Sequence, residues 1–261
     1  MKKLLLTFAL PFLAIFMTSC DSDDDNPTGS GGSAEAELYM PLAVGNYWVY
    51  ETKYYDEAGN EYSGDDEEFM TSMDTIRVEE MLTYQGKQAY KIYDSEDDDE
   101  ESSYFTIENG NLYIWFGLDE DDDEMSEMLP VDFSERWVMF LGPNGGMETI
   151  LNIDTSYTET IENVPVTVNM KFILDVEFED NGDYTFDGMT AESRASILNS
   201  DIDFSFAGFG GEAEKTSQRT IFMKGIGVVE SELGESTELD FMTGDETSWF
   251  GKQILVEYKL N

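Results

Sequence analysis

The sequence contains no histidine and only one cysteine among its 261 residues. The lack of histidine excludes Ser-His and Cys-His nucleophile systems, histidine-ligated zinc and histidine acid–base catalysis. A single cysteine, Cys20, cannot form a disulfide within the chain, so we expect packing alone to stabilise the fold. No P-loop or G-x-S-x-G nucleophile motif occurs, and carboxylate chemistry is the route left open to an enzyme.

Basic residues are also scarce, with 14 lysines and arginines against 57 acidic residues and a formal net charge of −43. Without the first 19 residues, which hold Lys2 and Lys3, the net charge becomes −45. A surface this acidic repels nucleic acids and anionic lipids, so we exclude nucleic acid as a partner. The charge favours a plain solubility surface, with bound divalent cations or a salty habitat as alternatives.

The N-terminus has the layout of a secretory leader. Lys2 and Lys3 precede 14 residues, 4–17, that are almost all apolar, and this run is too short to cross a hydrocarbon core about 30 Å thick. Two small residues and Cys20 follow, and the segment resembles the lipobox of bacterial lipoproteins. The resemblance implies cleavage before Cys20 and lipidation of its sulfur, which would anchor the protein to a membrane. An ordinary cleaved signal and an uncleaved anchor are the alternatives.

The residues after Cys20 are acidic (DSDDD, 21–25) and resemble the surface-export signal of lipoproteins in the Bacteroidetes group. The resemblance implies an outer-membrane lipoprotein exposed at the cell surface, and a periplasm-facing one is the alternative. A solvated tether explains the same composition, because like charges with Ser, Pro and Gly keep a chain extended. We divide the sequence into a signal peptide (1–19), an acidic Gly/Ser tether (20–37) and a β-domain (38–261).

The rest of the sequence predicts an all-β fold. Short segments with alternating apolar residues recur between turn residues, and residues 46–55 place Trp48, Tyr50 and Thr52 on one face. About a dozen strands with short connections predict a single antiparallel meander, either a sandwich or a partly open (half) barrel. Residues 190–199 are the one segment for which a short helix is an alternative to a strand. The other predicted strands are 75–84, 87–93, 104–108, 111–116, 135–141, 148–160, 164–168, 171–178, 184–186, 201–206, 217–224 and 252–260.

Turn signals set the hairpins. Asn109-Gly110 lies between two apolar runs and predicts a type I′ turn, which needs positive φ at both residues. Asn181-Gly182 predicts a second turn of this kind, and Gln85-Gly86 predicts a third hairpin. Residues 58–60 (AGN) turn the first strand back. Three acidic segments, 65–68, 94–101 and 119–124, are expected to be exposed loops.

Two fragments resemble uncharacterised secreted β-proteins: residues 41–50 (PLAVGNYWVY) match their P-L-x-x-G-N-x-W-x-Y start, and residues 224–230 (KGIGVVE) match a late G-V-G-x-V strand. Some of these proteins are similar to half-barrel carriers of lipoproteins and lipids. The resemblance therefore implies, as one alternative, a curved sheet around an apolar ligand. It carries no catalytic residue.

Candidate sites are few. Asp119, Asp121 and Asp123 have the alternate spacing of a calcium loop, but Glu124 and Pro130 stand where an EF-hand needs glycine and glutamate, so only a looser calcium site is expected there or at residues 180–183. Asp74-Thr75-Ile76 resembles the three-residue O-glycosylation site of Bacteroidetes secreted proteins, with Thr75 as the acceptor. For the tryptophans at positions 48, 115, 137 and 249, core packing is favoured over a carbohydrate platform.

These observations predict a lipid-anchored envelope protein whose β-domain is not an enzyme and has a binding or structural role. It would meet the membrane through its lipid, and its ligand would be a protein, a glycan or an apolar molecule. No cofactor is expected apart from calcium. The alternatives are a half-barrel carrier of an apolar ligand and a carboxylate-based glycan hydrolase, which needs two acids about 5–10 Å apart across a cleft.

Overall fold

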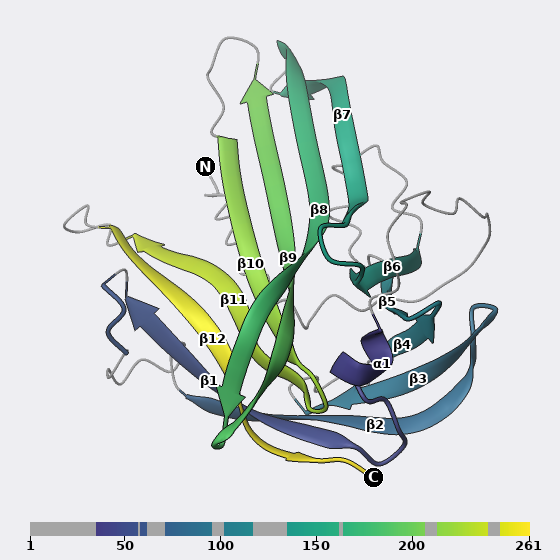
Figure 1. Cartoon of the computed structure of the whole chain (residues 1–261). Helices are drawn as coiled ribbons and strands as arrows, with labels where there is room; N and C mark the ends of the chain where they lie inside the picture. Colours follow the sequence, from purple (N-terminus) through teal and green to yellow (C-terminus); the bar gives the residue numbers. More distant parts are fainter. Residues whose placement is uncertain are drawn as a thin grey trace.

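The computed structural model describes residues 35–56, 58–61, 71–95, 102–116, 135–161, 164–206, 213–239 and 246–261. These residues form twelve strands of one antiparallel sheet and a single short helix, α1 (Ala36–Tyr39). The sheet curls round until its two edges approach each other, as in a nearly closed barrel (Figure 1). The predicted all-β antiparallel meander is confirmed as a partly open barrel and not as a sandwich. Within the described ranges, no helix is long and apolar enough to cross a bilayer.

Strands that follow one another in the chain are neighbours in the sheet, with one exception. The order is β6-β5-β4-β3-β2-β1-β12-β11-β10-β9-β8-β7, so β1 pairs with β12, and β6 and β7 are the edges. The strands are β1 (Tyr47–Asp56), β2 (Ser72–Tyr84), β3 (Lys87–Asp94), β4 (Ser103–Glu108), β5 (Asn111–Phe116), β6 (Arg136–Leu141), β7 (Met147–Ile161), β8 (Val164–Phe186), β9 (Met189–Phe206), β10 (Ala213–Met223), β11 (Gly227–Leu239) and β12 (Glu246–Lys259).

Side chains join the two edges at what we call the seam, formed by Met139 and Phe140 of β6, Glu148 of β7 and Ser196 of β9. The Met139 N–H donates to Glu148 Oε2 at 2.9 Å, and Ser196 Oγ donates to the Phe140 carbonyl. Burial raises the pKa of Glu148, whereas the hydrogen bond from the Met139 N–H and the positive charge of Arg136 lower it. The buried apolar side chains of the cluster at this side of the barrel are Val138, Met139, Ile150, Leu174, Val176 and Phe178.

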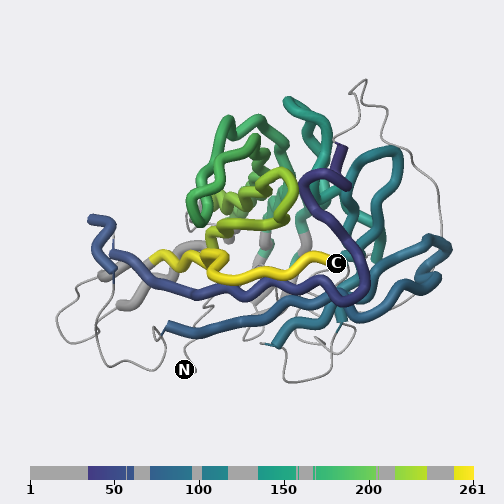
Figure 2. Tube along the Cα trace, turned by 60° about the horizontal axis from the view of Figure 1, so that its bottom comes forward, coloured from purple at the N-terminus to yellow at the C-terminus, as the bar shows by residue number. Residues whose placement is uncertain are grey.

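One end of the barrel is covered by residues 35–46, which we call the strap, and Figure 2 shows this segment crossing that end before β1 begins. The Ala36 N–H donates to the Gly110 carbonyl at 2.8 Å, and the Gly225 N–H donates to the Leu38 carbonyl at 2.7 Å. Ala36, Tyr39 and Met40 of the strap are buried in the main apolar cluster. The strap therefore closes this end of the barrel.

Asn46 fastens the end of the strap to the last residue of the sequence. Its Nδ2 donates to the Pro41 carbonyl at 2.6 Å, and its Oδ1 accepts the Asn261 N–H at 2.8 Å. The adjacent Gly45 N–H donates to the Val78 carbonyl at 2.8 Å. The Asn46 side chain thus joins the strap to Asn261, and backbone hydrogen bonds of Gly45 and Asn46 join the strap to β2.

The two fragments that resemble secreted β-proteins meet inside the barrel. Trp48 Nε1 donates to the Ile226 carbonyl at 2.6 Å, and the Tyr50 hydroxyl donates to the Val228 carbonyl at 3.1 Å. Gly227 lies against the indole with φ +121°, and a Cβ at this position would come within 2.7 Å of Trp48 Nε1. Only glycine satisfies both demands, so these fragments have a packing role.

Two of the predicted hairpin turns are confirmed, and one is wrong. Gln85-Gly86 and Asn109-Gly110 turn with positive φ at both residues. Asn181-Gly182 instead forms a bulge inside β8, and the turn comes later, at Asp187-Gly188. The helix considered for residues 190–199 is also absent from the described chain, because these residues belong to β9 and pair with β8 and β10.

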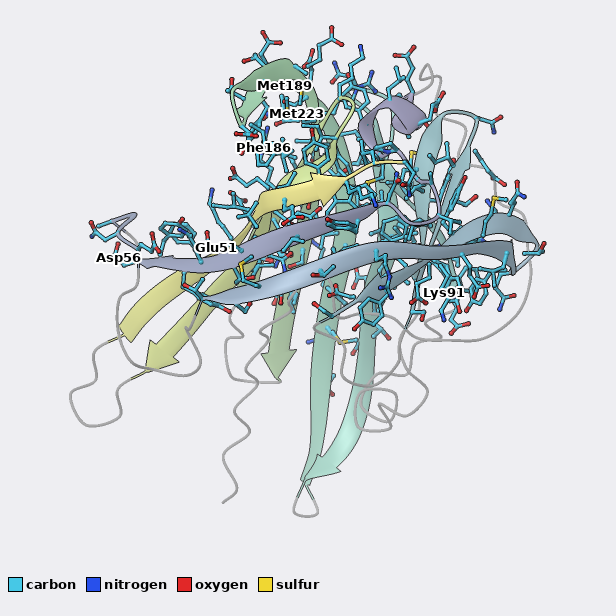
Figure 3. The ribbon with its side chains drawn as sticks, turned by 90° about the horizontal axis from the view of Figure 1, so that it is seen from below. Glu51, Asp56, Lys91, Phe186, Met189 and Met223 are labelled. Carbon is cyan, nitrogen blue, oxygen red and sulfur yellow. The ribbon has the colours of Figure 1, made fainter. Side chains whose placement is uncertain are left out.

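Successive antiparallel strands alternate in direction, so their connections sort to two ends of the barrel. The tight turns from β2 to β3, β4 to β5, β8 to β9 and β10 to β11 lie at the strap end. The connections that contain the three acidic segments follow β1, β3 and β5, which end at the opposite end of the barrel. Figure 3 shows this separation, with Asp56 at the end of β1 far from Phe186 and Met189 at the β8–β9 turn. Asp94 was expected in an exposed loop, but it ends β3 and is buried.

Candidate functional site

The residues predicted for lipidation and for the calcium loop lie outside the described residues. Cys20 belongs to the first 34 residues, and Asp119, Asp121 and Asp123 belong to residues 117–134. The predictions made for these four residues therefore stay predictions. Within the described ranges, no group of three or more carboxylates is placed to hold a metal ion.

Thr75, the predicted glycan acceptor, lies within β2, opposite Val49 of β1. Its N–H donates to Ser95 Oγ at 2.7 Å, and its carbonyl accepts the Ser95 N–H at 3.1 Å. The side chain is half-buried, on the face opposite to the buried Asp74. Glycosylation there stays a prediction that would require access to a residue in the middle of the sheet.

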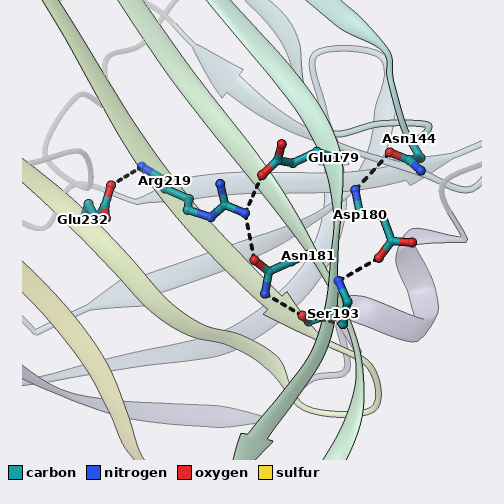
Figure 4. A network of polar contacts seen from close by, with 8 residues as sticks. Asn144, Glu179, Asp180, Asn181, Ser193, Arg219 and Glu232 are labelled. Carbon is teal, nitrogen blue, oxygen red and sulfur yellow. Dashed lines mark hydrogen bonds and ion pairs between the residues drawn. The ribbon is translucent and has the colours of Figure 1, made fainter.

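Residues 180–183, the second possible calcium loop, form the β8 bulge and are held by protein groups (Figure 4). Asp180 Oδ1 accepts the Gly182 N–H at 2.8 Å, and Asn181 Nδ2 donates to Ser193 Oγ at 2.8 Å. Arg219 of β10 donates to Asn181 Oδ1 at 2.7 Å and forms an ion pair with Glu179. These contacts fix the bulge against β9 and β10, which is a structural role.

The tryptophans divide between the two faces of the sheet. Trp48 is buried in the barrel core, as predicted. Trp115 and Trp137 are directly opposite each other on β5 and β6, on the other face from Leu112. Trp115 is only 7% exposed, so the predicted packing is confirmed for it, and Trp137 is half-buried. The side chain of Trp249 lies outside the described residues.

Trp115 and Trp137 belong to an aromatic cluster on the outer face. Tyr84 and Tyr104 stack with centroids 3.6 Å apart, and Tyr84 meets both tryptophans edge to face. Lys87 Nζ lies 5.7 Å from the Trp137 ring centroid, a cation–π distance. Protein groups thus cover ring faces that a sugar platform would need, which favours a packing role for the cluster.

A groove of about 740 Å³ opens at the strap end of the barrel. Its lining mixes carboxylates and amides with apolar side chains, and one carboxylate, Glu108, forms an ion pair with Lys87 at 2.7 Å. Both ends of the described chain contribute to it, so no local motif could have revealed it. The lining residues are Glu37, Pro41, Leu42, Ala43, Asn46, Gln88, Tyr90, Thr106, Ile107, Glu108, Gly110, Leu260 and Asn261.

The barrel interior next to the strap is filled with side chains. Large residues from opposite parts of the sheet pack together there, and several are less than 2% exposed. The largest fully buried ones are Trp48, Phe222, Leu112, Leu141, Met223 and Ile226. A carrier of an apolar ligand needs space in this position, and the described residues occupy it.

The chain matches no protein-family model and no curated protein. Two solved structures match the chain over most of its length at low similarity. A candidate lipoprotein of Parabacteroides distasonis is 12% identical with a TM-score of 0.40, over 85% of this chain and 98% of that one. A candidate exported protein of Bacteroides fragilis with a YmcC-like fold is 12% identical with a TM-score of 0.33, over 85% of this chain and 99% of that one. Likeness at this level defines neither a family nor a function.

Proposed function

We propose that the protein is a lipoprotein anchored to the cell envelope through Cys20, and that its barrel is a non-catalytic module with a binding or structural role at the cell surface. The leader and the acidic run after Cys20 support the anchor and its destination. The packed interior supports a module of this kind over a carrier of an apolar ligand.

One observation carries the proposal: the first described residues are clamped across one end of the barrel. Hydrogen bonds join the strap to Gly110 of the β4–β5 turn, to Gly225 of the β10–β11 turn and to Val78 of β2. The tether would therefore leave the barrel from its closed end, and tension on it would reach several strands at once. The opposite end, where the acidic connections begin, would then extend away from the membrane, in agreement with repulsion by anionic lipid headgroups.

The groove is the site where such a module would bind. It lies at the strap end and is lined by apolar side chains together with amide and carboxylate groups, so it suits a polar ligand better than a purely apolar one. The exposed Glu37 of the strap and Gln88 of β3 both line this groove.

The anchor is tested by mass spectrometry of the N-terminus after expression of the full chain in a Gram-negative host. We expect a peptide that begins at Cys20 and carries acyl chains, and loss of membrane association in Cys20→Ser. Thr18→Ser, next to the same cleavage site, is the matched control and should remain lipidated. An unmodified Cys20, or cleavage at another residue, would refute the anchor.

The packed barrel is tested separately by solvent extraction of the purified full chain and analysis of the released lipid. We expect no stoichiometric lipid beyond the chains bound to Cys20. A bound apolar molecule at one per chain would instead establish the carrier function and contradict a packed interior.

A further inference from the structure

The edge of the sheet formed by β7 extends well past the seam. β7 contains 15 residues and pairs with β8 along its length, whereas β6 contains six. Within the described ranges, the hydrogen bonds between β6 and β7 reach only Glu148 and Thr149, whose carbonyl accepts Arg136 Nη2 at 3.4 Å. We call residues 151–161 the free edge, since β8 is the one described strand that pairs with them. In Figure 1 this part of β7 lies at the border of the sheet, away from β6.

The free edge lacks the features that usually keep an exposed strand from pairing. It contains no lysine, arginine, proline or glycine, and the bulge of β7 precedes it, between Thr149 and Leu151. More than half of its residues are threonine, isoleucine or tyrosine, which favour strands. Sheets normally protect a long edge with charges, bulges or a cover, because its free N–H and carbonyl groups attract another strand. The free edge is therefore suited to strand addition.

The free edge also carries few charges for so acidic a chain. Of its exposed side chains Asn152, Asp154, Ser156 and Thr158, only one is acidic, although the sequence contains 57 acidic residues. Ile153 is buried on the opposite face. Repulsion between two copies of the chain is weak where acidic residues are sparse, so a second copy can approach this edge.

We propose that the free edge pairs with the free edge of a second copy, antiparallel and about a two-fold axis at Ser156. Residue 151 of one copy then lies opposite residue 161 of the other, so the whole free edge is paired and exchanges about ten backbone hydrogen bonds. Such an axis also keeps each face of the sheet continuous across the contact, because residues opposite each other share a face. The contact uses the same surface of both copies, so association stops at a dimer.

The charges agree with this register. With the axis at Ser156, Asp154 lies opposite the neutral Thr158 of the partner subunit. An axis at Asp154 would instead place two aspartates against each other, which destabilises a pair of strands. A pairing of the full length thus avoids contact between like charges at the exposed positions 152–158.

The first test measures self-association of the Cys20→Ser chain by analytical ultracentrifugation. We use about 1 to 100 μM protein, which covers micromolar dissociation constants. We expect a monomer–dimer equilibrium without larger species. Salt should strengthen the dimer, because it screens the repulsion between two strongly acidic copies.

Two lysine variants test the register. Ser156→Lys places two like charges against each other at the axis, whereas Thr158→Lys places each lysine opposite Asp154 of the partner subunit. Both positions are exposed on the same face, and both substitutions change the net charge equally, so each variant is the matched control of the other. We expect the dimer of Thr158→Lys to have a Kd at least about threefold lower than that of Ser156→Lys.

Disulfide cross-linking gives a second readout. In the Cys20→Ser background an introduced cysteine is the only thiol of the chain. Under mild oxidation with diamide, Ser156→Cys should form a covalent dimer, because directly opposite residues have Cα atoms about 4.5–5.5 Å apart. Thr158→Cys is the control and should not cross-link, because its two copies would be about 14 Å apart along the strands.

Three results would overturn the proposal. The first is a chain that stays monomeric throughout the concentration range at high salt, which would leave the edge to a different protein or to another part of this chain. The second is equal cross-linking of Ser156→Cys and Thr158→Cys, which indicates random collision. The third is a dimer that both lysine variants leave unchanged, which indicates another interface. All these measurements use chains without Cys20, so the dimer and the lipid anchor succeed or fail separately.

Discussion

Gly227→Ala tests the contact between the indole of Trp48 and the start of β11. The new methyl group would lie 2.7 Å from Trp48 Nε1, and φ at this residue is +121°. A residue forced into this backbone region costs about 1–3 kcal/mol, and overpacking of a filled core costs about 1–3 kcal/mol more. We therefore expect a loss of about 2–6 kcal/mol in the free energy of unfolding.

The assay is urea unfolding of the full chain followed by circular dichroism and tryptophan fluorescence. Gly225→Ala is the matched control, because Gly225 has φ +81° in the same turn but no atom within 4 Å of a new Cβ. It should show the backbone cost alone, about 1–2 kcal/mol. If Gly227→Ala costs no more than Gly225→Ala, the steric contact with Trp48 is refuted.

A double-mutant cycle separates the contact from the backbone strain. Trp48→Phe removes the nitrogen nearest to the new methyl group, together with its hydrogen bond to the Ile226 carbonyl. In that background, Gly227→Ala should cost about 1–3 kcal/mol less than it does in the native chain. Strictly additive losses would show that the two residues do not interact.

Two further predictions concern the seam and the strap. Because burial raises the pKa of Glu148 above its ordinary value of 4.5, the ionised carboxylate costs stability at neutral pH, and the cost disappears as the pH falls to that value. Glu148→Gln keeps an acceptor for the Met139 N–H and should be more stable than the native chain at pH 7 but not at pH 4.5. The free energies of unfolding are measured with urea at both pH values. The same difference between the variant and the native chain at both values would contradict this. Asn46→Ala loses the bonds to Pro41 and Asn261 and should cost about 1–3 kcal/mol with faster hydrogen exchange at Asn261, and an unchanged exchange rate would exclude this role.

Much of the fold follows from local sequence patterns. Alternation and Asn-Gly turns predict most strands, and they place Trp48, Tyr50 and Thr52 on one face of β1, as the structure confirms. Asn181-Gly182 misleads because positive φ at a glycine suits a bulge as well as a turn. Asp187-Gly188, a few residues later, has the same turn chemistry and forms the actual hairpin.

Residues 190–199 show the limit of local propensity. Their small and polar side chains, such as Ala191 and Ser193, are compatible with a short helix when read alone. In the barrel this segment lies between β8 and β10, which offer backbone hydrogen bonds on both sides, and the pairing overrides the local preference.

The candidate sites depend on register, which no local pattern contains. The groove joins Glu37 to Asn261, and the pairing of β1 with β12 places Thr52 opposite Gln253, across most of the chain length. The alternation in β1 indicates that Thr52 points inward, but only the pairing of β1 with β12 and β2 shows that Gln253 and Asp74 lie beside it.

The pairing of β1 with β12 has a consequence for how the chain folds. Tyr47 and Lys259 are cross-strand partners, so the β1–β12 pairing closes a loop that contains most of the sequence. All other pairings join strands that are consecutive in the chain. Loop closure on that scale is entropically costly and slow. A circular permutant that links Asn261 to Glu35 and has its new termini in the β6–β7 connection, at residues 143–145, would pair only strands that are consecutive in the chain. We expect this permutant to fold to the same barrel faster than the native chain. Such a result would show that the order of the strands in the chain affects the folding rate and not the final structure.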